Sequence, residues 1–394
     1  MTNEPTAPRG LAPLYLAGFT TAFGAHGVAS VLGAENDEIG MSLLGLGLVL
    51  ALYDLAEVVL KPLFGALSDR IGAKPVIIGG LVAFAVASAV AFVMPTVLVL
   101  ALARLGQGAA ASAFSPASSA SVARLAGKQR LGRYFGRYGA WKSLGYVLAP
   151  LLGIALTQWA GISAVYAMLG ALAIGAAVWV ALAMPSLPVL PRTRVTLADL
   201  VREVTARGFL IPTLMLATST AVIGVGVGFL PLLATRLSLP PLLGAAAVAV
   251  LALVSTVVQP IVGRWRDDGR ISTRAGSAAG LLLAAVALVL LALAPGVATM
   301  FIAAAAFGLM TGTVTPLAFA HLADVTPHER MGRTMGSAEL GREIGDAGGP
   351  LLVGAVATAW TLPAALALLG AVSAASATLG WSALRRSGPE SAAG

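Results

Sequence analysis

Charged side chains occur inside long apolar stretches of this chain, where a charge costs several kcal/mol unless it is paired or hydrated. Asp54, Glu57 and Lys61 share one face of a predicted helix, at positions i, i+3 and i+7. Glu57 and Lys61 have the spacing of an ion pair, whereas Asp54 lies two turns from Lys61 and nearer the middle of the stretch. A carboxyl group held away from water can exchange a proton near neutral pH. We therefore expect Asp54 and Glu57 to carry protons, with structural pairing as the alternative.

A second charged face lies near the C-terminal end. One side of a predicted helix carries Glu339, Arg342, Glu343 and Asp346. Of these, Asp346 lies nearest the middle of its apolar stretch. We expect Asp346 to exchange protons. We expect Arg342 and Glu343 to belong to a gate in which Arg342 pairs with the acidic face around Asp54 in one state and separates from it in another.

Other polar residues in apolar stretches are candidates for a substrate cavity. We place His26, Gln107 and Lys142 there. His26 is the one deep histidine, and a hydrogen-bonded packing role is an alternative to a proton relay. Together with Arg104 and Arg342, Lys142 has the charge needed to bind an anion.

The composition requires lipid around these residues. The chain has 394 residues, of which 58% are hydrophobic and only 11% are charged, against roughly 25% charged in a soluble domain. It has no cysteine, which excludes disulfides and thiolate metal sites. No phosphate-binding loop is present, so we expect neither a cofactor nor an enzymatic activity, and any transport must be driven by a gradient.

Helices of about 20 apolar residues cross a bilayer, and the chain holds twelve such stretches. The connections after the odd-numbered stretches carry 1 basic residue in total. The other side carries 20, if Arg137 in the first turn of the fifth stretch is counted with it. This bias predicts a plasma or inner membrane protein with both termini in the cytoplasm, and the scattered basic loops argue against nucleic acid binding. The expected spans are 11–33, 41–64, 75–94, 96–119, 134–158, 162–184, 209–235, 240–262, 275–294, 297–320, 335–358 and 361–384.

The chain contains an internal repeat. Residues 130–136 (RLGRYFG) match residues 330–336 (RMGRTMG), and the same offset of 200 places Pro150 on Pro350. We therefore expect an N-terminal six-helix half at 1–184 and a C-terminal half at 209–394. Between them, 185–208 is a cytoplasmic linker with a short amphipathic helix near Thr196–Ala206. Parallel repeats predict a pseudo-two-fold axis along the membrane normal.

The stretch from Leu63 to Pro75, LFGALSDRIGAKP, joins the second and third expected spans. It resembles the G-x-L-x-D-R-x-G-x-K-P loop of major facilitator superfamily transporters, at every defining position. The resemblance implies an all-α fold of twelve transmembrane helices in two pseudo-symmetric halves, with alternating access to a central site. It also implies that the charged loop gates the cytoplasmic side. The residues concerned are Gly65, Asp69, Arg70 and Lys74.

Two more stretches resemble signatures of this family. R-L-G-Q-G at 104–108 is similar to the R-x-x-x-G signature of the fourth span, which implies a role for Arg104 in proton coupling, with structural hydrogen bonding as the alternative. Gly136, Gly145, Ala149-Pro150 and Gly153 are similar to the antiporter signature of drug:proton exporters, with Ala149 and Ile154 departing from it. We expect a hinge at Gly145 and Pro150, and its repeat at Gly345 and Pro350.

These patterns predict a monomeric, proton-coupled antiporter that exports drug-like or amphipathic small molecules. An exporter or importer of a polar metabolite, sugar or organic anion is the alternative, and loss of anion transport in Arg342→Ala with cation transport retained would favour it. The loop at Gly263–Asp268 echoes Leu63–Pro75, because a nearby offset aligns Pro260, Gly263 and Asp267 with Pro62, Gly65 and Asp69, but it lacks the Gly-x-Lys-Pro ending. We therefore expect the cytoplasmic latch, meaning the contacts of these two loops, to be asymmetric.

Overall fold

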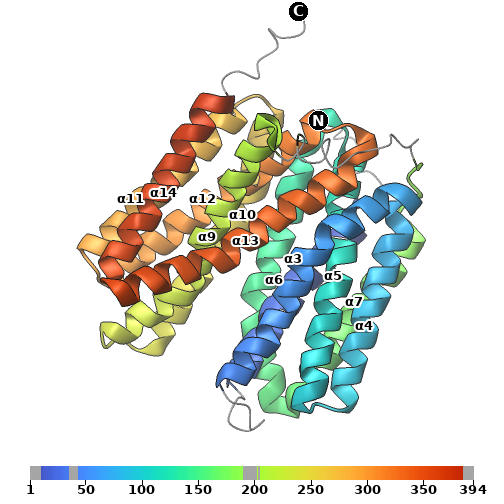
Figure 1. Ribbon diagram of the computed structural model, residues 1–394, viewed down its shortest axis with the longest axis horizontal. Helices are drawn as coiled ribbons and strands as arrows, with labels where there is room; N and C mark the ends of the chain where they lie inside the picture. Colours follow the sequence, from blue (N-terminus) through green and yellow to red (C-terminus); the bar gives the residue numbers. More distant parts are fainter. Residues whose placement is uncertain (1–9, 35–42, 190–201, 203–204, 385–394) are drawn as a thin grey trace, which may run out of the picture. The chain divides into compact units, whose positions relative to one another are not determined.

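The computed structural model describes residues 10–34, 43–189, 202 and 205–384, and every regular element in these residues is a helix (Figure 1). Within the described residues there are twelve α-helices of 21 to 30 residues. Most of the predicted linker helix, Thr196–Ala206, lies outside the described residues. The elements are α1 (Leu11–Ala34), α3 (Leu43–Ile71), α4 (Ala73–Val93), α5 (Val97–Ala126), η1 (Lys128–Arg130), α6 (Leu131–Ala160), α7 (Ile162–Ala183), α9 (Arg207–Arg236), α10 (Pro241–Asp267), α11 (Thr273–Leu293), α12 (Val297–Val325), η2 (His328–Arg330), α13 (Met331–Ala359) and α14 (Leu362–Ala383).

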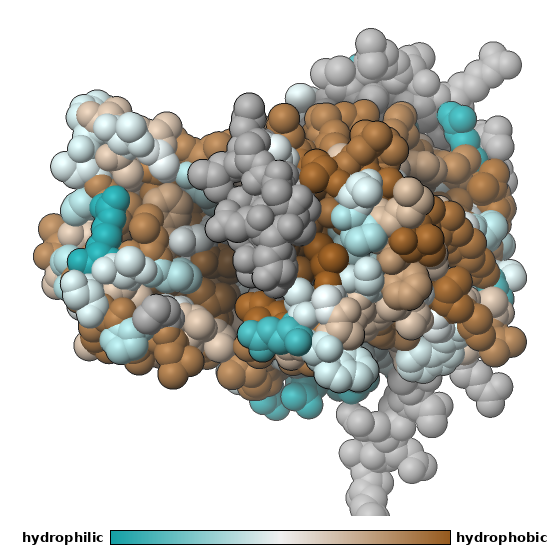
Figure 2. Space-filling view, turned by 90° about the horizontal axis from the view of Figure 1, so that it is seen from below, coloured by the Kyte–Doolittle hydropathy of each residue, from teal (hydrophilic) through white to brown (hydrophobic). Residues whose placement is uncertain are grey.

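Within the described residues, eight helices are long and apolar enough to cross a membrane, or nine if the bent helix α6 counts as one span. The exceptions include α3 and α13, which carry the charged faces predicted from the sequence. Large apolar side chains lie on the surface, such as Leu182 at 82% and Leu293 at 79% exposure. Figure 2 shows apolar side chains over much of the face in view. Such a surface requires hydrocarbon as its solvent.

The helix bounds repeat with the offset of 200 that the sequence predicts. Helix α4 begins at Ala73 and α11 at Thr273, and α7 ends at Ala183 where α14 ends at Ala383. The single-turn helices η1 and η2 also differ by 200. The internal repeat is therefore confirmed at the level of secondary structure.

The chain forms two compact units. Unit 1 comprises Met1–Gln129, Trp141–Arg192 and Thr326–Ser337, and unit 2 comprises Arg130–Ala140, Thr193–Val325 and Ala338–Gly394. In unit 1, α5 packs against α1, α3 and α4, and α7 packs against α1 and α4. In unit 2, α12 packs against α9, α10 and α11, and α14 packs against α9 and α11. The first turns of α6 and α13 each belong to the unit that does not hold the rest of the helix.

Candidate functional site

A carboxylate near the end of α3 binds the start of α13. Asp69 accepts hydrogen bonds from the backbone amides of Gly332 and Arg333, at N···O distances of 2.8 and 2.9 Å. The first amides of a helix have no partner within the helix and form the positive end of its dipole, so a carboxylate suits them. These bonds join segments 263 and 264 residues apart in the chain. The gating role of Asp69 stays a prediction, and this is the contact that a gate would open.

The same contact occurs a second time. Asp267 at the end of α10 accepts hydrogen bonds from the amides of Gly132 and Arg133 at the start of α6, at 2.8 and 2.6 Å. The expectation of an asymmetric latch is wrong in this respect. The contact needs only a carboxylate and the free amides of a helix start, and neither depends on a Gly-x-Lys-Pro ending.

Glycines allow both contacts. A Cβ atom on Gly65 would overlap the carbonyl oxygen of Gly332, and one on Gly263 would overlap that of Gly132. The two backbones therefore touch directly at each crossing. Each aspartate lies one helical turn beyond such a glycine, which brings its carboxylate to the helix start.

The remaining predicted gate residues of the first loop have other surroundings. Lys74 donates a hydrogen bond from Nζ to the carbonyl oxygen of Met184, just beyond α7, at 2.7 Å. Gly72 has φ 97°, a conformation that favours glycine, and ends α3. Arg70 is exposed. The Gly-x-Lys-Pro ending therefore shapes the turn and holds it against α7.

Burial raises the pKa of Asp69 to about 6. The hydrogen bonds from Arg333 and Gly332 and the charges of Arg333 and Arg124 oppose this shift but do not cancel it. Asp69 thus changes its charge within the range of pH that a cell can reach.

In α3, Glu57 and Lys61 form a buried ion pair, with Oε2 and Nζ 3.1 Å apart and side chains 4% and 0% exposed. The pairing that the spacing offered is therefore confirmed. Asp54 is exposed, one turn before Glu57. A proton-carrying role for Asp54 or Glu57 stays a prediction.

Arg104 is buried in α5, with 2% exposure. Its guanidinium donates hydrogen bonds to the carbonyl oxygens of Gly24 and Ala25 in α1, at 2.9 and 3.3 Å. It also lies 4.2 Å from the centroid of the Tyr53 ring in α3. This cation–π contact and the two carbonyls stabilise a charge that lipid would reject. Arg104 thus ties α5 to α1 and α3.

All three predicted cavity residues have local partners. Gln107 is fully buried and donates to Ser88 Oγ in α4 at 2.9 Å, so it contributes to helix packing. The His26 ring lies 4.2 Å from that of Tyr146 in α6. Lys142 Nζ lies 3.4 Å from Ser115 Oγ. Their predicted role in substrate binding stays untested.

Helix α13 packs against α9 within unit 2, and two residues of its charged face lie near α9. Thr220 donates a hydrogen bond to the carbonyl oxygen of Arg342 at 2.6 Å, and Arg342 lies 3.6 Å from Glu343. Asp346 lies against Gly224, since a Cβ atom there would stand 3.1 Å from Asp346 Oδ1. Glu339 is buried, with 1% exposure. The predicted gate between Arg342 and the acidic face of α3 stays a prediction.

The predicted hinge residues lie where small residues bring helices together. A Cβ atom on Gly145 would stand 2.9 Å from the carbonyl oxygen of Phe19 in α1, and one on Gly345 would overlap that of Ala217 in α9. We call these two crossings the glycine seams. The parts Lys128–Ala149 and Leu151–Ala160 of the α6 region are bent by 40° relative to each other.

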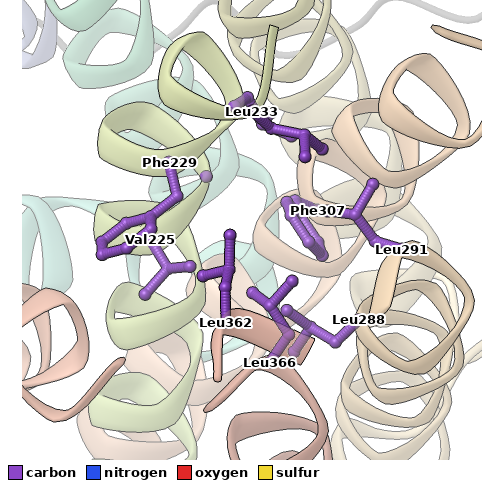
Figure 3. A pocket seen from close by; sticks show the side chains of 10 residues that line it. Val225, Phe229, Leu233, Leu288, Leu291, Phe307, Leu362 and Leu366 are labelled. Atoms are coloured by element: carbon purple, nitrogen blue, oxygen red, sulfur yellow. The ribbon is translucent and has the colours of Figure 1, made fainter. Parts of the chain in front are cut away.

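One enclosed cavity in unit 2 does not resemble a substrate site. It lies among α9, α11, α12 and α14, and only apolar side chains and one glycine line it (Figure 3). Val225 and Phe229 project into it from α9, facing Phe307 and Leu366. Its volume of 10 Å³ is about the space that one water needs.

Sequence reasoning found one part of this arrangement and missed another. The alignment of Pro260, Gly263 and Asp267 with Pro62, Gly65 and Asp69 had already placed Asp267. The partners of Arg104 in α1 and α3 left no signal, because backbone carbonyls carry no sequence and Tyr53 lies 51 positions away.

The residues matched by the profile of the Major Facilitator Superfamily are 14–293 and 213–394. The chain belongs to this family. It is therefore a multi-pass membrane protein and a secondary transporter, in a family of transporters and not of enzymes.

Individual relatives are distant. The inner membrane transport protein YajR of Escherichia coli is 33% identical over 149 residues, which are 36% of this chain and 32% of YajR. The quinolone resistance protein NorA of Staphylococcus aureus is 29% identical over 140 residues, 36% of each chain. These matches span less than half of the relatives' length. The crystal structure of the human organic anion transporter MFSD10 has a TM-score of 0.81 at 18% identity and covers 96% of this chain and 100% of that one, which shows the shared fold.

Proposed function

We propose that this transporter is a proton-coupled antiporter that exports drug-like or amphipathic small molecules by alternating access. The observation that carries the proposal is the pair of glycine seams, at Gly145 in α6 and Gly345 in α13. They contain the residues that resemble the antiporter signature. Helices that touch through glycine can slide or bend with little steric cost.

Acidic residues supply the proton side of this proposal. In the proposed cycle a proton from outside binds Asp54 or Glu57, with Arg104 as a fixed neighbouring cation, or binds Asp346. Substrate leaves as the proton enters. The contacts of Asp69 and Asp267 break and form again as the cytoplasmic side opens and closes. Similarity to the quinolone resistance protein supports a drug-like substrate.

Export of an organic anion is the second candidate. Arg104 and Lys142 are both buried cations of unit 1, and the structurally similar human protein is an organic anion transporter. We propose the drug-like substrate first because the glycine seams favour antiport, whereas the cations also have packing roles.

The test is flux in proteoliposomes carrying a pH gradient, with a fluorescent lipophilic cation and, separately, a fluorescent organic anion as substrates. We expect pH-driven cation flux, and we expect Asp54→Asn to abolish it. Asp268→Asn, which neutralises an exposed carboxylate at the end of α10, is the matched control. Flux of the anion alone would favour the second candidate.

If cation flux is unchanged in Asp54→Asn, Glu57→Gln and Asp346→Asn, the proposed proton coupling is wrong. We also propose a monomer in the cell membrane with both termini in the cytoplasm. Labelling of cysteines introduced at the two termini, in intact and opened cells, tests the orientation.

A further inference from the structure

We propose that a groove on the surface of unit 1, between α4 and α7, binds one acyl chain of a membrane lipid. The two helices pack side by side (Figure 1). The groove has a volume of about 350 Å³, at the lower end of the range for ligand pockets. The binding concerns lipid alone and does not depend on the proposed transport.

Small residues hollow the groove and large ones border it. Ala89 on α4 and Ala171 on α7 lie in its walls, beside Gly170. Val86 and Ile174 also line it and are 58% and 46% exposed. The result is an apolar channel, with a shape that suits a linear hydrocarbon chain.

The surroundings identify the occupant as hydrocarbon. Both helices belong to the spans of a membrane protein, and their mean hydropathies are 2.6 and 2.1. Val82, Val90 and Val178 are exposed on the same two helices, so the groove is continuous with the interface between protein and lipid. Hydrocarbon fills this hollow with dispersion contacts, which a void would lose.

The repeat shows which residue creates the hollow. With the offset of 200, Val289 of α11 stands where Ala89 stands in α4. A Cβ atom on Gly370 would lie 3.4 Å from Val289 Cγ2, whereas the nearest atoms to one on Gly170 are 3.8 Å away and belong to other residues of α4. In unit 2 a valine side chain thus occupies the space that alanine leaves open in unit 1.

The floor of the groove connects it to the buried polar residues of unit 1. The Tyr166 ring lines the groove and is 0% exposed. Its hydroxyl has no hydrogen-bond partner among the described residues, and it lies within electrostatic range of Arg104.

The test uses the full chain in nanodiscs doped with a phosphatidylcholine that carries a diazirine in mid-chain. After photolysis, we expect labelled peptides to concentrate on 85–92 and 166–174 and to saturate at low probe content. Ala89→Val, which copies the side chain of unit 2, should lower this labelling about fivefold, which corresponds to about 1 kcal/mol. Val289→Ala should raise labelling of α11 and α14.

Ala83→Val, at an exposed alanine of α4 outside the groove, is the control and should leave labelling unchanged. Thermal unfolding of each variant checks that it folds. Even, unsaturable labelling of all exposed helices, or labelling of the groove that Ala89→Val does not change, would overturn the proposal. Cross-linking of α4 in one copy to α4 in another would mean that a second copy covers the groove, and would overturn it equally.

Discussion

Adding one methyl group at Gly65 should open the contact between α3 and α13. A Cβ atom at this position would overlap the carbonyl oxygen of Gly332, so Gly65→Ala forces the two backbones apart. The amides that Asp69 binds belong to the same turn of α13 and move with it. The variant should therefore favour the state in which these bonds are broken.

The size of the shift between the bonded and the broken state follows from the steric overlap. Extra atoms in a packed crossing cost about 1–3 kcal/mol, which changes an equilibrium roughly 5- to 150-fold. The backbone is the obstacle, so no side-chain rotation relieves the overlap. We expect the upper part of this range.

Ser68 offers a direct readout. It is 3% exposed at the same crossing, and its hydroxyl donates to the carbonyl oxygen of Gly65 at 2.7 Å. The chain has no cysteine, so Ser68→Cys introduces a single thiol that is shielded while the crossing is closed. Maleimide should label this thiol faster when Gly65→Ala is added, by the factor given above.

The second crossing offers a parallel test, and a glycine with free space around it offers a control. Gly263→Ala should act on the contact of Asp267 with α6 in the same way, since a Cβ atom there would overlap the carbonyl oxygen of Gly132. Gly79→Ala in α4, which has nothing within 4 Å of the added atom, should not change labelling. An unchanged rate in folded Gly65→Ala, or an equal rise in Gly79→Ala, would refute the reasoning.

Three further outcomes are expected. Lys61→Ala should destabilise the protein by about 3–5 kcal/mol, because it leaves Glu57 charged and buried. Its melting temperature in detergent should fall, and adding Glu57→Gln should recover much of that fall. No recovery would contradict the pairing. Arg104→Lys should lower the melting temperature, because an ammonium cannot span both carbonyls and the ring, and an unchanged value would argue against these contacts. The pKa of Asp69 is raised from 3.8 to about 6, so the state in which Asp69 binds α13 gains stability as pH falls through 6 and loses it as pH rises. The rate of Ser68→Cys labelling, divided by the rate in the unfolded protein at the same pH, should therefore fall when the pH is lowered from about 7.5 to about 5. Asp69→Asn should remove this dependence on pH.

The cytoplasmic contacts show where sequence reasoning succeeded and failed. Spacing alone offered the pairing of Glu57 with Lys61 as an alternative, because both residues lie on one helix of known geometry. The alignment placed Asp267 on Asp69, but the asymmetric latch was wrongly expected because only the first loop has the Gly-x-Lys-Pro ending. The residues of this ending, among them Gly72 and Lys74, build a turn against α7 and take no part in the bond to α13.

Hydrophobicity and period are local properties. From the sequence alone they determined that the chain spans a membrane, that its helices repeat at an offset of 200, and that charges lie within α3, α5 and α13. Tertiary structure alone decided which backbone groups meet these charges. The groups concerned are the carbonyls of Gly24 and Ala25 and the amides of Gly332 and Arg333. Their position and not their side chain makes them partners, so no residue type predicts them. The groove beside Ala89 likewise needed coordinates, because a hollow depends on what a second helix leaves unfilled.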